Sequence, residues 1–167
     1  MSFTATTSQE NSVSALLLRL QQRELLIPKV MVADVLTWNS ELFVASSSTE
    51  SSWRLGEYYW KEQKIPLICV EKIMQTPSAH EELIKRKVIV LKSCQSEYAD
   101  RHYAIHCRGF PKPLILSEKS LDFLDAETNQ EWIAHSISIG SRVLDIPDFA
   151  ALEGAVWFTH SELHQSA

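Results

Sequence analysis

The chain has 167 residues and a formal net charge of −5 at pH 7, with 45% hydrophobic and 22% charged residues. This length and composition are typical of one soluble globular domain, or at most two small ones. The excess of acidic residues argues against a general nucleic-acid-binding protein, because such a protein needs a basic surface to neutralise phosphates.

The two ends of the chain differ in composition from its middle. Residues 1–12 are polar and rich in Ser and Thr, with no Lys or Arg, which predicts a disordered tail and no secretory signal. We expect one folded domain over residues 13–155 and a C-terminal tail over 156–167. No apolar stretch approaches the ~18 residues of a membrane span. Three cysteines without a C-x-x-C pair favour a reducing compartment, so we expect a cytoplasmic protein.

Short apolar runs alternate with polar turns along the middle of the chain, which predicts β-hairpins. The expected strand pairs lie over residues 16–20 and 25–28, 55–60 and 65–70, 88–91 and 102–107, and 131–139 and 142–146. A further short strand is expected at 114–116, a loop at 45–52, a short helix within 76–85 and one helical turn at 147–152. The pattern predicts an all-β protein with short helices and a barrel-like architecture.

An internal echo supports two related halves. Residues 65–73 form an apolar strand that runs into a helical turn, and residues 142–149 repeat this type of segment. Each segment is preceded by a hairpin. We therefore expect two similar small β subdomains that interlock into one unit.

Motifs for phosphate binding or nucleophilic catalysis are absent from the sequence. The four glycines are too far apart for a P-loop or a dinucleotide fingerprint, and no G-x-S-x-G elbow is present. Cys69 and Cys107 lie in apolar runs, where a buried and inert thiol is expected. Cys94 has no base or oxyanion hole nearby in the sequence. We predict no catalytic residue and no cofactor.

Two histidine pairs have a spacing of four residues. His160 and His164 would share a face of a helix, but no third ligand is evident and we expect a solvated C-terminus there. His102 and His106 are expected on one strand, where a rise of ~3.3 Å per residue separates them by ~13 Å. Neither pair predicts a metal site.

Aromatic residues cluster around Gly56. In an alternating strand Tyr58 and Trp60 share one face and Tyr59 takes the other, so at least one ring should point outward. Exposed aromatic side chains beside a polar turn are typical of protein-binding surfaces. The alternative is that these rings serve only the core and surface of one hairpin.

The order of these motifs resembles the CheW-like domain, the adaptor of bacterial chemosensory arrays. The resemblance rests on Leu25-Leu26-Ile27-Pro28 followed by Val30-x-Val32-Ala33-Asp34-Val35, and on Trp53-Arg54-Leu55-Gly56 before a hairpin that ends Ile65-Pro66-Leu67-Ile68. The ending Ile146-Pro147-Asp148-Phe149 is most similar to the ChpC-type paralogues of type IV pilus (twitching) clusters. The family's central turn usually reads Asn-Leu-Arg-Gly, where this chain has Tyr59-Trp60-Lys61-Glu62. This difference favours a specialised or accessory adaptor.

The resemblance implies two five-stranded barrels around a shared core and no catalysis. It also implies binding to the regulatory domain of a CheA-type histidine kinase and to the cytoplasmic tip of a chemoreceptor. We predict the contact surface at Gly56, Tyr58, Trp60, Lys61 and Glu62, with the hairpin around Gly140 as a second candidate. We expect a monomer when the protein is alone. The alternative hypothesis is a small β-barrel ligand-binding protein or enzyme unrelated to signalling.

Overall fold

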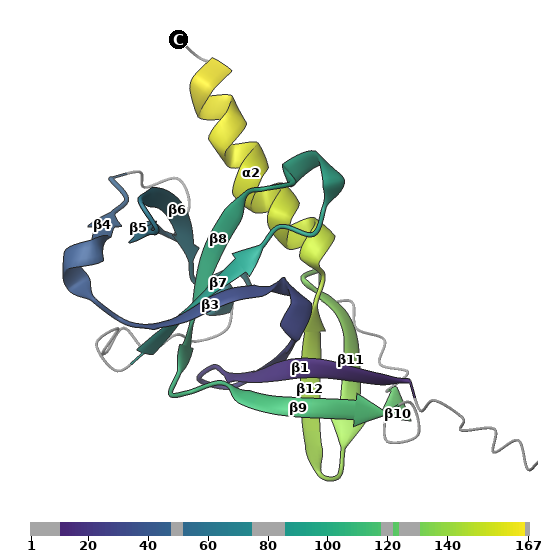
Figure 1. Ribbon diagram of the computed structural model, residues 1–167. Helices are drawn as coiled ribbons and strands as arrows, with labels where there is room; N and C mark the ends of the chain where they lie inside the picture. Colours follow the sequence, from purple (N-terminus) through teal and green to yellow (C-terminus); the bar gives the residue numbers. More distant parts are fainter. Residues whose placement is uncertain (1–10, 48–51, 75–85, 118–121, 124–130, 166–167) are drawn as a thin grey trace, which may run out of the picture.

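The computed structural model describes residues 11–47, 52–74, 86–117, 122–123 and 131–165, with side chains at all of these except 122–123 and 158–165. The tail expected over most of residues 1–12 and the helix expected within 76–85 lie outside the described residues. The all-β expectation is confirmed, because strands form most of the described chain in two sheets. Figure 1 shows one sheet at the upper left and the other at the lower right.

Each sheet contains six strands. Sheet A has the order β10 (Asp122–Phe123), β11 (Ile133–Ile139), β12 (Arg142–Pro147), β2 (Glu24–Pro28), β1 (Ser12–Arg19) and β9 (Lys112–Ser117). Sheet B has the order β4 (Phe43–Ala45), β5 (Arg54–Trp60), β6 (Gln63–Ile68), β8 (His102–Arg108), β7 (Arg86–Lys92) and β3 (Val32–Thr37). The family resemblance implied five strands in each subdomain, whereas each sheet has six and includes a short edge strand, β4 or β10.

The two sheets interlock by exchanging one strand each. Hairpin β1–β2 lies in sheet A, but the next strand, β3, crosses to sheet B and pairs with β7. Hairpin β7–β8 lies in sheet B, and the next strand, β9, crosses to sheet A and pairs with β1. Each sheet also contains a second hairpin, which pairs in parallel with the first: β12 pairs with β2 in sheet A, and β6 pairs with β8 in sheet B. The two halves of the chain therefore follow the same path, as the internal echo predicts.

Three hydrophobic clusters hold the sheets together. One lies within sheet A and one within sheet B. The third lies between the sheets, where the hairpins β1–β2 and β7–β8 contribute residues such as Leu18, Ile27, Ile89 and Ile105. Strands of these two hairpins are therefore buried on both faces, which explains their continuous apolar sequences. This third cluster is the shared core that the family resemblance implies.

The last helix is longer than the sequence predicted. In place of one turn at 147–152, α2 runs from Phe149 to Gln165, following the Asp148 side chain, which accepts a hydrogen bond from the Ala151 N–H at 3.1 Å. Leu152, Val156 and Trp157 are buried in the shared core. The prediction of a C-terminal tail from residue 156 onward is therefore wrong at its start, because residues 156 and 157 belong to the folded core. Figure 1 shows α2 passing the connection between β7 and β8 and extending beyond the end of the sheet.

Short helical segments complete the chain. They are α1 (Val70–Ile73) after β6 and the 3-10 helices η1 (Lys29–Met31), η2 (Ser40–Leu42) and η4 (Ser96–Tyr98). The four predicted hairpins all form, with strand ends shifted by a few residues. Both predicted strand-to-helix segments are present, as β6 into α1 and β12 into α2.

Candidate functional site

The predicted contact residues all belong to the hairpin β5–β6. Its strands alternate as expected: Tyr58 and Trp60 point into the cluster within sheet B, and Tyr59 points outward with 40% of its surface exposed. The two strands pair from Arg54 to Trp60 and turn through two residues, Lys61 and Glu62. The sequence therefore located the hairpin and the shared face of Tyr58 and Trp60 correctly, but not which face is buried.

Trp60 is a core residue and not an exposed contact. Only 8% of its surface is accessible. Its indole N–H donates a hydrogen bond to Asp34 Oδ2 at 3.0 Å, and its ring lies 4.9 Å from that of His102. Burial lowers the pKa of His102, so the imidazole is neutral beside the indole. Trp60 thus joins the hairpin to β3 and β8, and the prediction that it offers a free surface is wrong.

Tyr58 and Gly56 are also internal. Tyr58 is fully buried and its hydroxyl oxygen accepts a hydrogen bond from the Asn39 N–H at 3.2 Å. A Cβ atom added at Gly56 would lie 2.0 Å from the carbonyl oxygen of Val44, and φ there is +155°. Gly56 is therefore required for the close approach of β4 to β5. These two predicted contact residues are structural.

The turn residues are exposed, as the prediction requires. Lys61 and Glu62 have φ values of 45° and 62°, which is the left-handed backbone that a two-residue type I′ turn needs. Neither residue is a glycine, so the turn carries conformational strain. The Lys61 ammonium lies 4.9 Å from the centre of the Trp60 ring. The buried indole therefore positions the charge at the end of the hairpin.

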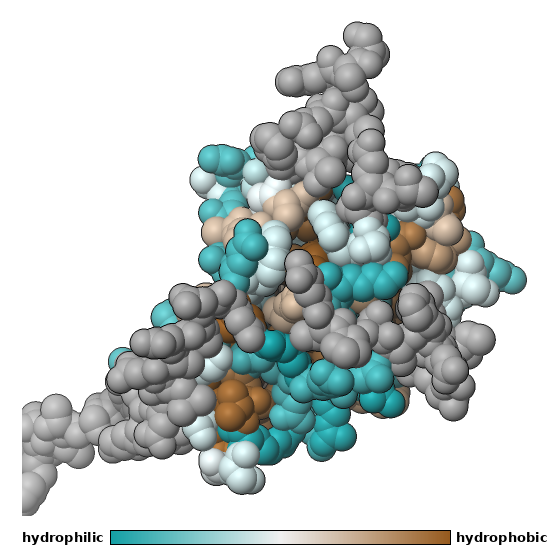
Figure 2. Space-filling view, turned by 180° about the vertical axis from the view of Figure 1, so that it is seen from behind, coloured by the Kyte–Doolittle hydropathy of each residue, from teal (hydrophilic) through white to brown (hydrophobic). Residues whose placement is uncertain are grey.

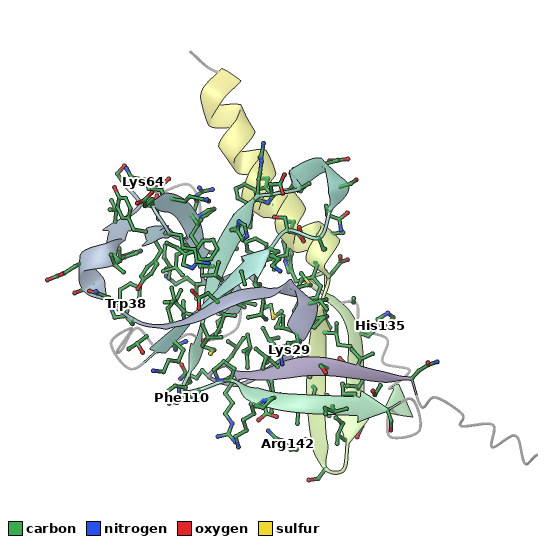
Figure 3. The ribbon with its side chains drawn as sticks, viewed as in Figure 1. Lys29, Trp38, Lys64, Phe110, His135 and Arg142 are labelled. Carbon is green, nitrogen blue, oxygen red and sulfur yellow. The ribbon has the colours of Figure 1, made fainter. Side chains whose placement is uncertain are left out.

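An outward row of side chains continues from the turn along the hairpin. Tyr59 pairs across the strands with Lys64, whose Nζ lies 5.3 Å from the ring centre. A hydrogen bond with Tyr59 raises the pKa of Lys64, so the ammonium stays charged. Figure 3 shows Lys64 at the β5–β6 end of the molecule, far from Arg142 on sheet A. We call Tyr59, Lys61, Glu62 and Lys64 the tip surface. It keeps two of the five predicted residues and adds two.

The second predicted candidate, the hairpin around Gly140, occupies the corresponding place in sheet A. It joins β11 to β12, and Gly140 supplies the positive φ of 61° that its two-residue turn needs. Its exposed side includes Val143, and Arg142 forms a bidentate ion pair with Glu24. No aromatic residue accompanies this turn in β11 or β12, so it offers less contact area than the tip surface.

The cysteines are not arranged as nucleophiles. Cys69 and Cys107 are buried, and burial raises both pKa values, that of Cys107 to about 12. Cys94 is exposed, but its thiol donates to Glu153 Oε2 at 2.9 Å, and partial burial together with that hydrogen bond raises its pKa. Thiols with raised pKa values are poor nucleophiles. The expectation that Cys69 and Cys107 are buried is confirmed.

The histidine pairs can be compared with their expected positions. His102 and His106 lie on β8, as predicted. The side chains of His160 and His164 lie outside the described part of the structure. Among the described residues, no group of three His, Cys, Asp or Glu side chains could hold a metal ion. Within the same residues, no helix combines the length and the hydropathy of a membrane span.

A buried polar network was not anticipated from the sequence. Arg86 Nη1 donates to Glu71 Oε1 at 3.0 Å and to His106 Nδ1 at 2.9 Å, and all three residues are at most 5% exposed. Desolvation, with Arg86 next in importance, lowers the pKa of His106 to about 3. The network closes the end of the sheet-B cluster opposite Trp60. The sequence signal for it is the pair of charged residues, Arg86 and Lys87, directly before the apolar run 88–91.

The fold can now be compared with known proteins. No protein-family description and no curated protein sequence matches this chain. Its structure is similar to the crystal structure of the scaffolding protein TtCheW from Thermoanaerobacter tengcongensis, with a TM-score of 0.65. The match covers 83% of this chain and 90% of that chain at 10% sequence identity. The chain therefore has the fold of a CheW scaffolding protein, and the fold implied by the resemblance is confirmed.

Proposed function

We propose that this protein is a non-catalytic adaptor of a bacterial chemosensory system, which links a chemoreceptor to a CheA-type histidine kinase. The observation that carries the proposal is the CheW scaffold fold over 83% of the chain, together with the sequence motifs of its two hairpins.

The tip surface is our candidate for the contact with the regulatory domain of the kinase. It combines an exposed aromatic ring, Tyr59, with the charges of Lys61, Glu62 and Lys64. Aromatic side chains are common at the centre of protein interfaces, and charged side chains are common at their rim. A rigid base supports them, since Tyr58 and Trp60 fix the opposite face of the same strand in the core.

A second exposed region lies where the chain passes between the sheets and is our candidate for the receptor tip. Phe110, in the connection from β8 to β9, is 76% exposed and its ring lies 3.9 Å from Lys87 Nζ. Lys87 also donates to Thr37 on the edge strand β3, where Val35 is partly exposed. An apolar surface of this kind fits the side of a helix better than a small ligand.

Binding to purified partners tests the proposal. Kinase regulatory domains and receptor cytoplasmic fragments from the genome that encodes this chain would be titrated into the protein by calorimetry. We expect binding to both classes, and binding to neither would contradict the adaptor role. Lys61→Glu should slow association with the kinase domain and change its salt dependence, because a rim charge acts mainly on the encounter. Lys29→Glu makes the same charge change at an exposed site outside the tip surface and is the matched control.

The pathway is the finer part of the proposal. We place the adaptor in a type IV pilus (twitching) system on the strength of the Ile146-Pro147-Asp148-Phe149 ending. We also propose that it is cytoplasmic and a monomer when it is alone. Deletion of the gene should impair twitching and leave flagellar swimming unchanged. The reverse result would retain the adaptor and change the pathway.

A further inference from the structure

A polar recess of about 210 Å³ lies beside the tip surface, between the outer face of β5–β6, the start of β8 and α2. Three cations from separate elements face it: Arg54 on β5, Lys64 on β6 and Arg101 just before β8. Pro66 and Trp157 form apolar walls. The recess therefore offers positive groups and an apolar lining in one place, and it shares Lys64 with the tip surface.

The charges of the recess are not neutralised in pairs. Two carboxylates, Glu57 and Asp100, also line it, which leaves one positive charge in excess in a chain with a net charge of −5. Among the described residues, none of the ion pairs within 4 Å involves Arg54, Lys64 or Arg101. A recess with unneutralised cations on an acidic protein is suited to an anionic group.

Arg54 is the centre of this arrangement. It is half-buried, its Nη1 donates only a long hydrogen bond of 3.4 Å to the Val156 carbonyl oxygen, and burial lowers its pKa. The Arg101 guanidinium lies 5.3 Å from the ring centre of Trp157 and 5.8 Å from that of Tyr98. Glu57 attracts Arg54 electrostatically, but among the described residues neither guanidinium group forms an ion pair with a carboxylate within 4 Å. A carboxylate that reached Arg54 would form charge-assisted hydrogen bonds and offset its desolvation.

We propose that this recess binds the carboxylate of a glutamate side chain from an acidic segment of a partner protein. The planar guanidinium of Arg54 matches a carboxylate in two parallel hydrogen bonds. The methylene groups of glutamate fit the apolar walls formed by Pro66 and Trp157. That the partner is a protein rests on the proposed function, but the binding chemistry rests on the recess alone.

A titration followed by NMR tests the recess on the full chain. The probe is a capped pentapeptide, Gly-Leu-Glu-Leu-Gly, and its control is the same peptide with Gln in place of Glu. We expect saturable shifts of the Trp157 indole N–H and Arg54 Nε–H signals with the Glu peptide, and at least tenfold weaker binding of the Gln peptide. Equal binding of the two peptides, or shifts that do not saturate, would overturn the proposal.

Substitutions of the arginines test whether the Glu peptide binds in the recess. Arg54→Gln and Arg101→Gln should each weaken binding of the Glu peptide at least tenfold, with the backbone amide spectrum otherwise unchanged. Arg108→Gln removes an exposed arginine at the far end of β8 and should leave binding as it is. If Arg108→Gln weakens binding as much as Arg54→Gln does, the attraction is general and the proposal is wrong. Tighter binding of inorganic phosphate than of the Glu peptide would also overturn the carboxylate assignment.

The outcome is separable from that of the proposed function. A protein that binds the Glu peptide but neither kinase nor receptor would retain the recess and lose the adaptor role. A protein that binds the kinase domain with no effect of Arg54→Gln, and that ignores the Glu peptide, would retain the adaptor role and lose the recess.

Discussion

The two sheets share one strand layout but are filled differently. The interior of sheet B is aromatic, with Tyr58 and Trp60 buried and Trp38 and Phe43 packed against them. Polar contacts close it at both ends, through Asp34 on one side and Arg86 on the other. The interior of sheet A is aliphatic, built from residues such as Ala15, Leu17 and Ile137.

Sheet A retains an apolar hollow of about 160 Å³. Its walls come from β1, β2, β9, β11 and β12, with Val13, Ala15, Leu26, Pro28, Leu116, Ile137 and Ile146 as lining residues. Figure 2 shows hydrophobic side chains reaching the surface in the lower part of the molecule, where Figure 1 places sheet A. The aliphatic side chains of sheet A therefore leave space, whereas aromatic rings occupy the interior of sheet B.

The difference in filling shows which sheet can fix the conformation of the exposed residues at its hairpin turn. The tip surface lies on sheet B, where the buried indole of Trp60 anchors the strained turn through Asp34, His102 and Lys61. The corresponding turn of sheet A has a glycine, and the described strands β11 and β12 beside it contain no Trp, Tyr or Phe. A strained turn persists only where its surroundings determine it, and in this chain the filled sheet does so.

Removal of the anchor should have the largest effect. Trp60→Ala deletes a buried ring and its hydrogen bond to Asp34, and we expect a loss of about 3–5 kcal/mol in the free energy of unfolding. Urea denaturation measures it. Tyr59→Ala, on the outward face of the same strand, should change stability by less than about 0.5 kcal/mol. A Trp60→Ala protein as stable as the wild type would show that the ring is not buried.

Two alanines test the difference in filling directly. Ala104 lies in the cluster within sheet B and Ala15 in that within sheet A, and both are buried. Ala104→Val should destabilise the protein by about 1–3 kcal/mol, because its added methyl groups would meet the side chains packed in that cluster. Ala15→Val should stabilise it by about 1 kcal/mol, since its methyl groups enter the hollow. Equal effects of the two substitutions on the midpoint of urea denaturation would contradict the comparison.

The buried end of sheet B should be sensitive to acid. His106 has a pKa of about 3 in the folded protein against 6.5 when unperturbed, so between these values the unfolded chain binds a proton that the folded one does not. Stability therefore rises with pH in this window, and we expect a loss of about 2 kcal/mol between pH 7 and pH 5. His106→Gln should flatten this dependence, whereas His135→Gln, at an exposed site, should not. An unchanged slope in His106→Gln would assign the acid sensitivity to other groups.

The strained turn should give the smallest effect. Glu62→Gly places a glycine at a φ of 62° and should stabilise the protein by about 1 kcal/mol, because the left-handed backbone has no steric cost for glycine. Thermal unfolding measures the gain. Ser141→Gly in the turn of sheet A is the control, since positive φ there belongs to Gly140. Destabilisation by Glu62→Gly would mean that the Glu62 side chain holds the turn.

The hairpins and the relation between the two halves of the chain could be predicted from local patterns in the sequence. Continuous apolar runs such as 88–91 mark strands buried on both faces, and the polar segments between such runs mark the hairpins, because both patterns are local. The echo between residues 65–73 and 142–149 likewise needs no long-range information. These features carried the prediction of the fold, and the turn Lys61–Glu62 of the candidate site came with them.

Which face of each strand is buried depends on contacts with strands that are distant in the sequence. An alternating strand has two faces, and Tyr58 and Trp60 could have occupied either until β3 and β8 supplied Asp34 and His102. The recess depends in the same way on α2, whose Trp157 lies about a hundred residues from Arg54 in the chain. The helix itself could have been predicted from the sequence, since Asp148 precedes apolar residues at 149, 152 and 156. Its packing against the core could not, because a helix of this length is stable in water chiefly through tertiary contacts.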